Sequence, residues 1–234
     1  MATTKTSYSV ISLEEAGAEA AQRGFGLDTT PDPDTGRRGR VYVRRDLDIG
    51  SFGVNAFYQG MTGARVVGEH DELGPGASGH EELYVVVAGG CTFTVDGDEV
   101  DAPQGTAVFV RDPATRRGAR ATEDGTIVLA IGGSPGEVFR QGPGETIGAF
   151  YRLYREKDYD GALSACLEGL EVNPGNAMIL YNVACLESLL GRPEEALEPL
   201  AEALAAWPDY KEQAAADDDL APLRDDPRFQ ALVA

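Results

Sequence analysis

The hydrophobic pattern of this 234-residue chain changes its period near residue 140, and this change limits the possible folds more than any other feature. Before it, short runs rich in Val, Thr, Phe and Gly are broken by turn residues, which is typical of strands. After Gly144 the chain is rich in Ala, Leu and Glu at helical spacing. A strand-rich part followed by a helical part predicts an α+β protein with two modules.

The strand-rich part predicts a sandwich or barrel, because its expected strands are many, short and separated by Gly and Pro turns. They cover residues 52–59, 65–70, 83–87, 91–95, 99–100, 106–110 and 126–131. Asp96-Gly97 supplies the positive φ angles of a tight hairpin between two of them. We expect a β-barrel over residues 41–138 and a helical region over 145–234.

Residues 1–40 are expected to form an N-terminal helix and loop. Leu13 to Ala21 could be helical, with Ser12 as the N-cap. The basic run Arg37-Arg38-Gly39-Arg40 lies in a stretch rich in Gly, Pro and Asp, so we interpret it as a solvated loop. A local contact with an anion is the alternative.

The stretch from about residue 50 to 133 resembles a cupin, the small jelly-roll barrel. Glu82-Leu83-Tyr84-Val85-Val86-Val87-Ala88-Gly89 looks like the end of the first cupin motif, which has a Glu seven residues before a Gly. Pro103-Gln104-Gly105-Thr106-Ala107-Val108-Phe109-Val110 looks like the second motif, a Pro-x-Gly turn before an apolar strand. The resemblance implies a jelly roll with a metal site in its mouth.

This chain departs from the cupin pattern at the metal ligands. His70-Asp71-Glu72 resembles the His-x-His pair of metal-binding cupins, with Glu72 in the second place. Arg116 falls about where the last His is expected, and a cation cannot bind a metal. The usual set of three His and one Glu is therefore absent, so a metal must be held by other ligands.

The two histidines of the chain, His70 and His80, lie ten residues apart, and each stands beside carboxylates. Residues two apart in a strand face the same side, so His70 and Glu72 would share one face, and His80, Glu82 and Tyr84 another. Two imidazoles with one or two carboxylates suit Fe, Mn, Ni or Zn, so we predict a divalent metal held by His70, His80 and Glu82, with Glu72 as the fourth ligand or as a base. Two alternatives remain open. One is a metal-free site in which His80 or Glu82 is a general base, and the other is a set of solvated surface groups.

Two further residues are candidates for the same site. Arg116 would bind a carboxylate substrate, or Glu82 itself, if it points into the mouth. Otherwise Arg111, Arg116, Arg117 and Arg120 are solvent charges on a turn. Tyr84 could donate a proton, although a Tyr in a strand is more often a core residue with a satisfied hydroxyl.

The helical part resembles tetratricopeptide repeats, whose period is about 34 residues. The better copy runs from Ala177 to Pro208, and a weaker one precedes it. The matching positions are Leu180, Val183, Ala184, Gly191, Ala196, Leu200, Ala203 and Pro208, and in the weaker copy Tyr159, Ala162, Cys166, Gly169 and Pro174. Two repeats are fewer than a stable array needs, so we expect them to dock on the barrel or on a second copy, which favours a homodimer.

Composition limits the kinds of partner and the cell compartment that we expect for this protein. A net charge of −19 repels phosphate backbones and anionic lipid, so neither nucleic acid nor a membrane is an expected partner. The three cysteines form no Cys-x-x-Cys pair and lie in apolar patterns, which predicts buried free thiols. The start of the chain has no apolar signal region, so we expect a cytoplasmic protein.

The sequence thus favours a metal-dependent cupin-type enzyme acting on a small polar substrate, with oxygenase, isomerase, cyclase and decarboxylase activities left open. One alternative is a sensor or adaptor that binds a small molecule or metal, with helical repeats that contact a protein partner or a second copy. The other is a structural protein with a vestigial site.

Overall fold

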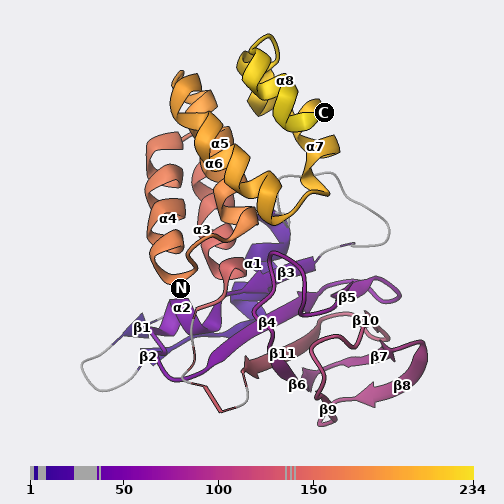
Figure 1. The fold of residues 1–234 in the computed structure, drawn as a ribbon. Helices are drawn as coiled ribbons and strands as arrows, with labels where there is room; N and C mark the ends of the chain where they lie inside the picture. The colour runs from indigo at the N-terminus through magenta and orange to yellow at the C-terminus, as the bar shows by residue number, and fades with distance from the viewer. Residues whose placement is uncertain are drawn as a thin grey trace. The chain divides into compact units, whose positions relative to one another are not determined.

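The computed structural model describes residues 3–4, 9–23, 36, 38–134, 136–137, 139 and 141–234, and these fall into two compact units. Met1–Arg140 is the first unit and Gln141–Ala234 the second. Strands dominate the described part of the first unit, and the second is helical (Figure 1). The predicted α+β class is confirmed.

The first unit is built from strands with two short helices near its start. Its strands among the described residues are β1 (Thr3–Thr4), β2 (Ser9–Val10), β3 (Arg38–Val41), β4 (Gly53–Gln59), β5 (Arg65–His70), β6 (Glu81–Ala88), β7 (Gly90–Val95), β8 (Asp98–Pro103), β9 (Ala107–Val110), β10 (Arg117–Ala121) and β11 (Thr126–Gly133). Its helices are α1 (Leu13–Arg23) and α2 (Val43–Leu47). The Oγ of Ser12 accepts a hydrogen bond from the Glu15 N–H at 3.2 Å, which confirms it as the cap of α1.

The strands β4 to β11 form a jelly roll. One sheet has the order β5-β10-β7-β8, and the other has the order β3-β4-β11-β6-β9. Numbered from β4, the eight strands lie in the two sheets in the orders 2-7-4-5 and 1-8-3-6, which is the pattern of two interleaved Greek keys. This strand order confirms the cupin-like fold, and β3 extends the second sheet by one edge strand.

The two sheets enclose an apolar interior. Its buried residues are Phe57, Val66, Val67, Tyr84, Val86, Cys91, Phe93, Ala102, Val110, Ala119, Val128 and Ala130. The outer side of β3 and β4 packs instead against α1. Gly17 of α1 and Gly39 of β3 allow this close approach, because a Cβ at Gly39 would collide with the Gly17 carbonyl oxygen.

The basic run near residue 38 is part of the sheet, so our interpretation of it as a solvated loop is wrong for the described residues. Arg38 opens β3, and its Nε donates to the Val66 carbonyl at 3.2 Å. Burial and the nearby charges of Arg40 and Arg65 lower the pKa of Arg38 to about 10. Arg37 lies outside the described residues.

The second unit is a series of packed helices. These are α3 (Pro143–Arg155), α4 (Tyr159–Val172), α5 (Ala177–Leu189), α6 (Pro193–Ala206), α7 (Tyr210–Ala216), the 3₁₀ helix η1 (Asp218–Leu223) and α8 (Pro227–Val233). The starts of α3 and α5 are 34 residues apart, and so are those of α4 and α6. Gly169 of α4 admits Thr146 of α3 at a distance that any Cβ would block. Assignment to the tetratricopeptide repeats stays a prediction.

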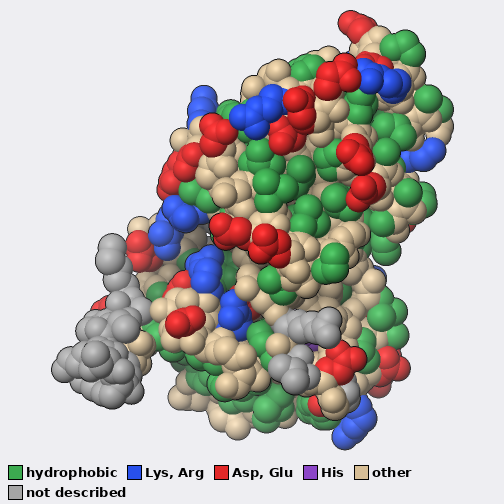
Figure 2. Space-filling model, turned by 60° about the vertical axis from the view of Figure 1, so that its left-hand side comes forward, with side chains coloured by type: hydrophobic (Ala, Val, Ile, Leu, Met, Phe, Trp, Pro, Cys, Tyr) green, Lys and Arg blue, Asp and Glu red, His purple; other side chains and the backbone are tan. Residues whose placement is uncertain are grey.

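The surface and the thiols agree with the composition. On the face drawn in Figure 2, acidic side chains are dispersed with basic ones between them. All three cysteines are buried and free, as the sequence predicts. Within the described part of the chain, no helix combines the length and the apolar character needed to cross a bilayer.

Candidate metal centre inside the barrel

Three of the four predicted metal ligands converge in the jelly roll. His70, Glu72 and Glu82 each offer one ligand atom, and these atoms all lie within 4.8 Å of one another. The Nε2 of His70 is 3.7 Å from Oε1 of Glu72 and 3.5 Å from Oε2 of Glu82. The spacing of residues 70, 72 and 82 in the sequence therefore does lead to one cluster.

Local backbone structure fixes the two carboxylates. His70 ends β5, and the Glu72 N–H donates to the Pro113 carbonyl at 2.8 Å, which ties the following turn to the chain before β10. Oε2 of Glu72 accepts from the Ser78 N–H at 3.0 Å. Glu82 is the second residue of β6, and alternation in the strand places it on the same face as Tyr84, which is completely buried.

The imidazole of His70 is oriented for binding a cation. Its Nδ1 lies 2.8 Å from the Gly68 carbonyl oxygen, which can only accept, so Nδ1 carries a proton. In the neutral ring, Nε2 then presents its lone pair to the oxygens of Glu72 and Glu82. Acceptors that face one another repel, and either a proton shared among these groups or a metal ion between them would remove that repulsion.

Arg117 supplies a fixed positive charge to the site. It is 1 % exposed, and its Nη2 donates to Oε2 of Glu82 at 3.0 Å. Its Nη1 donates to the carbonyls of Thr115 at 2.8 Å and Pro113 at 3.2 Å. The hydroxyl of Tyr84 also donates to Oε2 of Glu82. One oxygen of Glu82 is thus held by two donors from the chain itself.

These contacts shift the pKa values of Glu72 and Glu82 in opposite directions. Burial alone would raise the pKa of Glu82, but hydrogen bonds from His70 and Tyr84 and the charges of His70 and Arg117 lower it to about 2. Burial and the neighbouring Glu82 charge raise the pKa of Glu72. Burial and Glu82 raise the pKa of Tyr84 well above its usual range.

His80 does not join the cluster, which corrects the predicted set of four ligands. Gly79 has a φ of +66°, so the extended backbone of β6 begins only at Glu81 and the expected alternation does not reach residue 80. The imidazole of His80 lies beside the ring of Phe139, with 5.9 Å between the ring centroids. His80 therefore stands next to the site without offering it a ligand atom.

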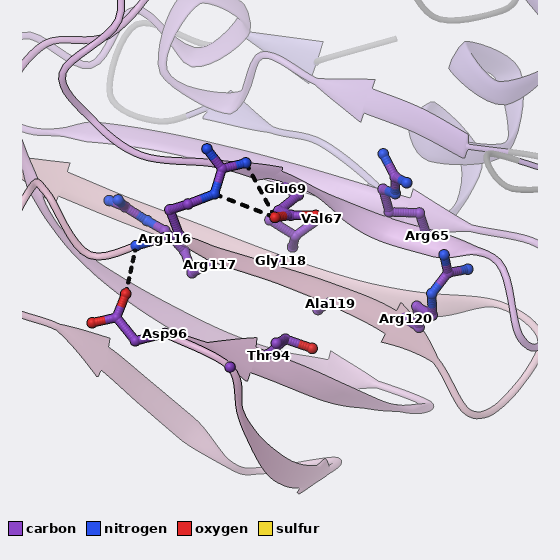
Figure 3. A pocket seen from close by; sticks show the side chains of 11 residues that line it. Arg65, Val67, Glu69, Thr94, Asp96, Arg116, Arg117, Gly118, Ala119 and Arg120 are labelled. Carbon is purple, nitrogen blue, oxygen red and sulfur yellow. Dashed lines mark hydrogen bonds and ion pairs between the residues drawn. The ribbon is translucent and has the colours of Figure 1, made fainter.

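Arg116 does not point into the barrel, so the condition under which we expected it to bind substrate there is not met. Its guanidinium is 59 % exposed and pairs with Oε1 of Glu69 at 3.1 Å. Figure 3 shows this pair on the outer face of the sheet, where the backbone N–H of Arg116 also donates to the side chain of Asp96. Both residues line a groove of about 510 Å³ on that face, together with Arg65, Thr94 and Arg120.

The interior arginine is Arg117, one residue further along. Because side chains alternate along a strand, a shift of one residue exchanges the inner and outer faces. The sequence carries a signal for this, since Arg117, Ala119 and Ala121 alternate with Gly118 and Arg120 as in a strand. We expected either an inward Arg116 or a turn with solvent charges there, so the strand and its interior Arg117 were both missed.

The residues present fit a divalent metal ion. His70 supplies one nitrogen, Glu72 and Glu82 supply oxygens, and the Nδ1–H of His70 is held by the Gly68 carbonyl, as in many metal-binding histidines. One nitrogen and two carboxylates leave coordination positions open for a substrate. The donor set does not choose among Fe, Mn, Ni and Zn.

A second group of ligand-type residues lies in the helical unit. Cys185, Asp217 and Asp219 bring their ligand atoms within 4.8 Å of one another. Asp217 accepts from Tyr181 and Asp219 from Tyr154, each at 2.8 Å, and Asp217 also caps η1. These bonds account for both carboxylates as structural groups.

No protein-family model and no curated protein matches this chain. Solved structures do match its strand-rich part. A cupin protein from Bacteroides fragilis matches with 18% identity over 49% of this chain and 89% of its own, at a TM-score of 0.35. KdgF from a Halomonas species matches with 18% identity over 51% of this chain and 92% of its own, also at 0.35. A predicted oxalate decarboxylase from Thermotoga maritima matches with 18% identity over 41% and 76%, at 0.31. The fold assignment rests on the strand order described above.

Proposed function

We propose that this protein is a metal-dependent cupin-type enzyme that acts on a small polar substrate inside the jelly roll. The observation that supports this most is the orientation of His70, whose Nε2 faces the oxygens of Glu72 and Glu82 while Nδ1 is held by Gly68. A divalent ion there would act as a Lewis acid on a substrate oxygen. Oxygenase, isomerase, cyclase and decarboxylase activities all stay within the proposal.

The side chains would have different roles in catalysis. Glu72 is a metal ligand in this proposal, or the general base if His70 and Glu82 hold the ion without it. Glu82 is a poor base, since Arg117 and Tyr84 hold one of its oxygens and its pKa is about 2. Tyr84 would position Glu82 rather than exchange a proton, because its own pKa is raised. Arg117 would keep Glu82 ionised and add positive charge for an anionic substrate.

Elemental analysis of untagged protein tests the proposal, and the two histidines provide a matched pair. We expect about one equivalent of Fe, Mn, Ni or Zn in the wild type, loss of the metal in His70→Ala, and retention in His80→Ala, because His80 lies outside the cluster. A folded wild type that refuses added ions would refute the metal. Equal loss in both variants would refute the ligand set.

A metal-free sensor or adaptor is the second candidate. It is favoured by the contacts of Glu82, whose charge the chain already balances with Arg117. In this case the helical repeats would contact a partner or a second copy, and α4 exposes Leu167 and Val172, at 48 % and 44 %, for such a contact. Light scattering would show the proposed homodimer as twice the mass of 24.8 kDa. A wild type without metal that still binds a small ligand would favour this candidate.

A cytoplasmic location belongs to the same proposal. The thiols of Cys91, Cys166 and Cys185 are free, as is usual in a reducing compartment. Fractionation of cells that express the protein would test it.

A further inference from the structure

Three polar atoms of the two sheets are buried and have no hydrogen-bond partner among the described residues. They are Nε of Arg40 on β3, Oδ1 of Asn55 on β4 and Nε of Arg117 on β10. The Arg40 guanidinium lies over the rings of Tyr42 and Phe57, which accounts for its position, so Asn55 and Arg117 are the ones to explain. An unpaired buried acceptor or donor costs free energy, so such atoms in a native fold usually mark the place of a ligand or an ordered water. None of the sequence patterns pointed to Asn55.

The amide of Asn55 faces the interior of the jelly roll. Its neighbours Val54 and Ala56 belong to the cluster on the outer side of the sheet, whereas Phe57 belongs to the interior cluster. Since alternate residues of a strand share a face, Asn55 and Phe57 point inward. Arg117, from the opposite sheet, also points inward, because it contacts Glu82.

The strand register places Asn55 level with the candidate metal centre. Asn55 pairs with Ala130 on β11, and Ala130 pairs with Tyr84 on β6. Neighbouring strands are about 4.8 Å apart, so the Cα atoms of Asn55 and Tyr84 are separated by about 10 Å. Only the methyl group of Ala130 stands between them on this row, so little side-chain bulk separates Asn55 from the Tyr84–Glu82 pair.

The next row on the same face has few side chains of its own. It consists of Gly53, Gly132 and Glu82, two of which have no side chain. The ring of Phe139 covers the first of these glycines, since a Cβ on Gly53 would lie 2.7 Å from a ring carbon. The imidazole of His80 lies over the second glycine, since a Cβ on Gly132 would be 3.3 Å from Nδ1 of His80. The rings of Phe139 and His80 thus bound this row, and the Ala130 row carries the least side-chain bulk.

We propose that Asn55 and the Nε of Arg117 bind the organic ligand of this site, and that the ligand is a small hydroxy acid. An orphaned Oδ1 requires a donor, which a hydroxyl supplies, and an orphaned guanidinium N–H requires an acceptor, which a carboxylate supplies. Charge agrees with this choice. A divalent ion and Arg117 together carry three positive charges, and the ionised Glu72 and Glu82 carry two negative ones. A ligand with one negative charge would balance the remaining positive charge. The inference rests on the proposed interior site.

Binding of matched acids tests the inference directly. The probes are lactate, malate and gluconate, each paired with its counterpart without the hydroxyls, namely propionate, succinate and hexanoate. Their dissociation constants are measured by calorimetry on the full chain, with and without Mn²⁺. The wild type should prefer at least one hydroxy acid over its counterpart by about ten-fold or more, because a site built for a hydroxyl rejects the analogue that lacks it.

Two variants assign this preference to Asn55. Asn55→Leu should abolish it while raising the melting temperature, because the substitution removes an unpaired polar group. Asn55→Ala, which adds no volume, replaces it if the Leu variant does not fold. The control Thr94→Val makes a polar-to-apolar change on the outward, exposed side of β7 and should keep the preference.

The outcomes separate this inference from the proposed function. Loss of the hydroxyl preference in the Asn55 variants, with unchanged Mn²⁺ affinity by electron paramagnetic resonance, supports it. A second outcome also supports the inference: the wild type binds no Mn²⁺ but prefers hydroxy acids, and the Asn55 variants lose this preference. That outcome would remove the metal from the proposed function. A preference that survives in the Asn55 variants, or a wild type with no preference for any hydroxy acid, overturns it.

Discussion

Replacing Arg117 with methionine should destabilise the jelly roll far more than any surface charge would. The guanidinium is completely buried as a side chain and lies 3.0 Å from Oε2 of Glu82, whose own side chain is 14 % exposed. Arg117→Met leaves the Glu82 charge buried without its cation, and it also frees the carbonyls of Pro113 and Thr115. Removing one partner of a buried ion pair costs about 3–5 kcal/mol, so we expect a fall in melting temperature of roughly 10 °C.

The neighbouring residue provides the control. Arg116 has the same side chain one position earlier, but it is 59 % exposed and pairs with Glu69, which is 61 % exposed. Such surface pairs contribute about 0–1 kcal/mol, so Arg116→Met should change the stability little. A large contrast between these two variants is the expected result of the alternation in β10.

The assay must observe the first unit alone. Cys91 is the only thiol in that unit, and it is buried, so pulsed thiol labelling at increasing urea, read by mass spectrometry, reports the opening of the jelly roll. A chelator keeps metal from replacing the lost cation. Midpoints converted with the slope of the transition give the free energy of unfolding.

A double variant identifies the cause of the loss. If the uncompensated charge is responsible, Arg117→Met with Glu82→Gln should be more stable than Arg117→Met alone, because no charge is then left buried. If the double variant is less stable than the single one, lost packing explains the effect. The argument that Arg117 balances Glu82 would then be refuted.

Three further predictions concern titration. The pKa of Glu82 is about 2 in the fold against 4.5 ordinarily, so its ionised form stabilises the fold by about 3 kcal/mol above pH 4.5. This stabilisation is lost as the pH falls toward 2. In urea titrations, the stability of a Glu82→Gln variant should therefore fall less steeply with decreasing pH than that of the wild type. The pKa of Glu72 is raised, so its ionisation opposes folding, and Glu72→Gln should raise the urea midpoint at pH 7, whereas a lower midpoint would contradict the assigned direction. Burial raises the thiol pKa of Cys91 and Cys166 to about 12 and raises that of Cys185 further. Iodoacetamide at pH 8 should therefore label none of the three thiols until the fold opens. Labelling within seconds would argue against their burial.

The fold was predictable because its signals are local. Leu83 to Val87 is apolar and β-branched, and Asp96-Gly97 forms the hairpin turn between β7 and β8. Such features report the strand itself and its turn. The register between strands depends on contacts between distant parts of the chain, and the sequence alone did not define it for β10.

The candidate site was predictable in part, for the same reason. His70 and Glu72 are near neighbours at the end of β5, and Glu82 precedes an obvious strand, so their convergence followed from alternation. His80 was assigned to the ligand set on the expectation that strand alternation extends to residue 80, but Gly79 has a positive φ angle and interrupts it. A glycine in the sequence can adopt either a positive or a negative φ, so this interruption could not be predicted. Arg116 was proposed from its place in the cupin motif, and the strand that holds the interior Arg117 one residue later was not predicted.

Asn55 shows why the remaining part of the site could not be found in this way. It lies in β4 between residues that pack on the outer side of the sheet, so a period-two pattern identifies it only as an inward polar residue. Its relation to Tyr84 passes through Ala130, on a strand 75 residues further along the chain. In this jelly roll most consecutive strands lie in different sheets, so each sheet is assembled from strands that are distant in the sequence. The metal ligands of such a fold can therefore be proposed from a motif, whereas the residues that select the substrate require the register.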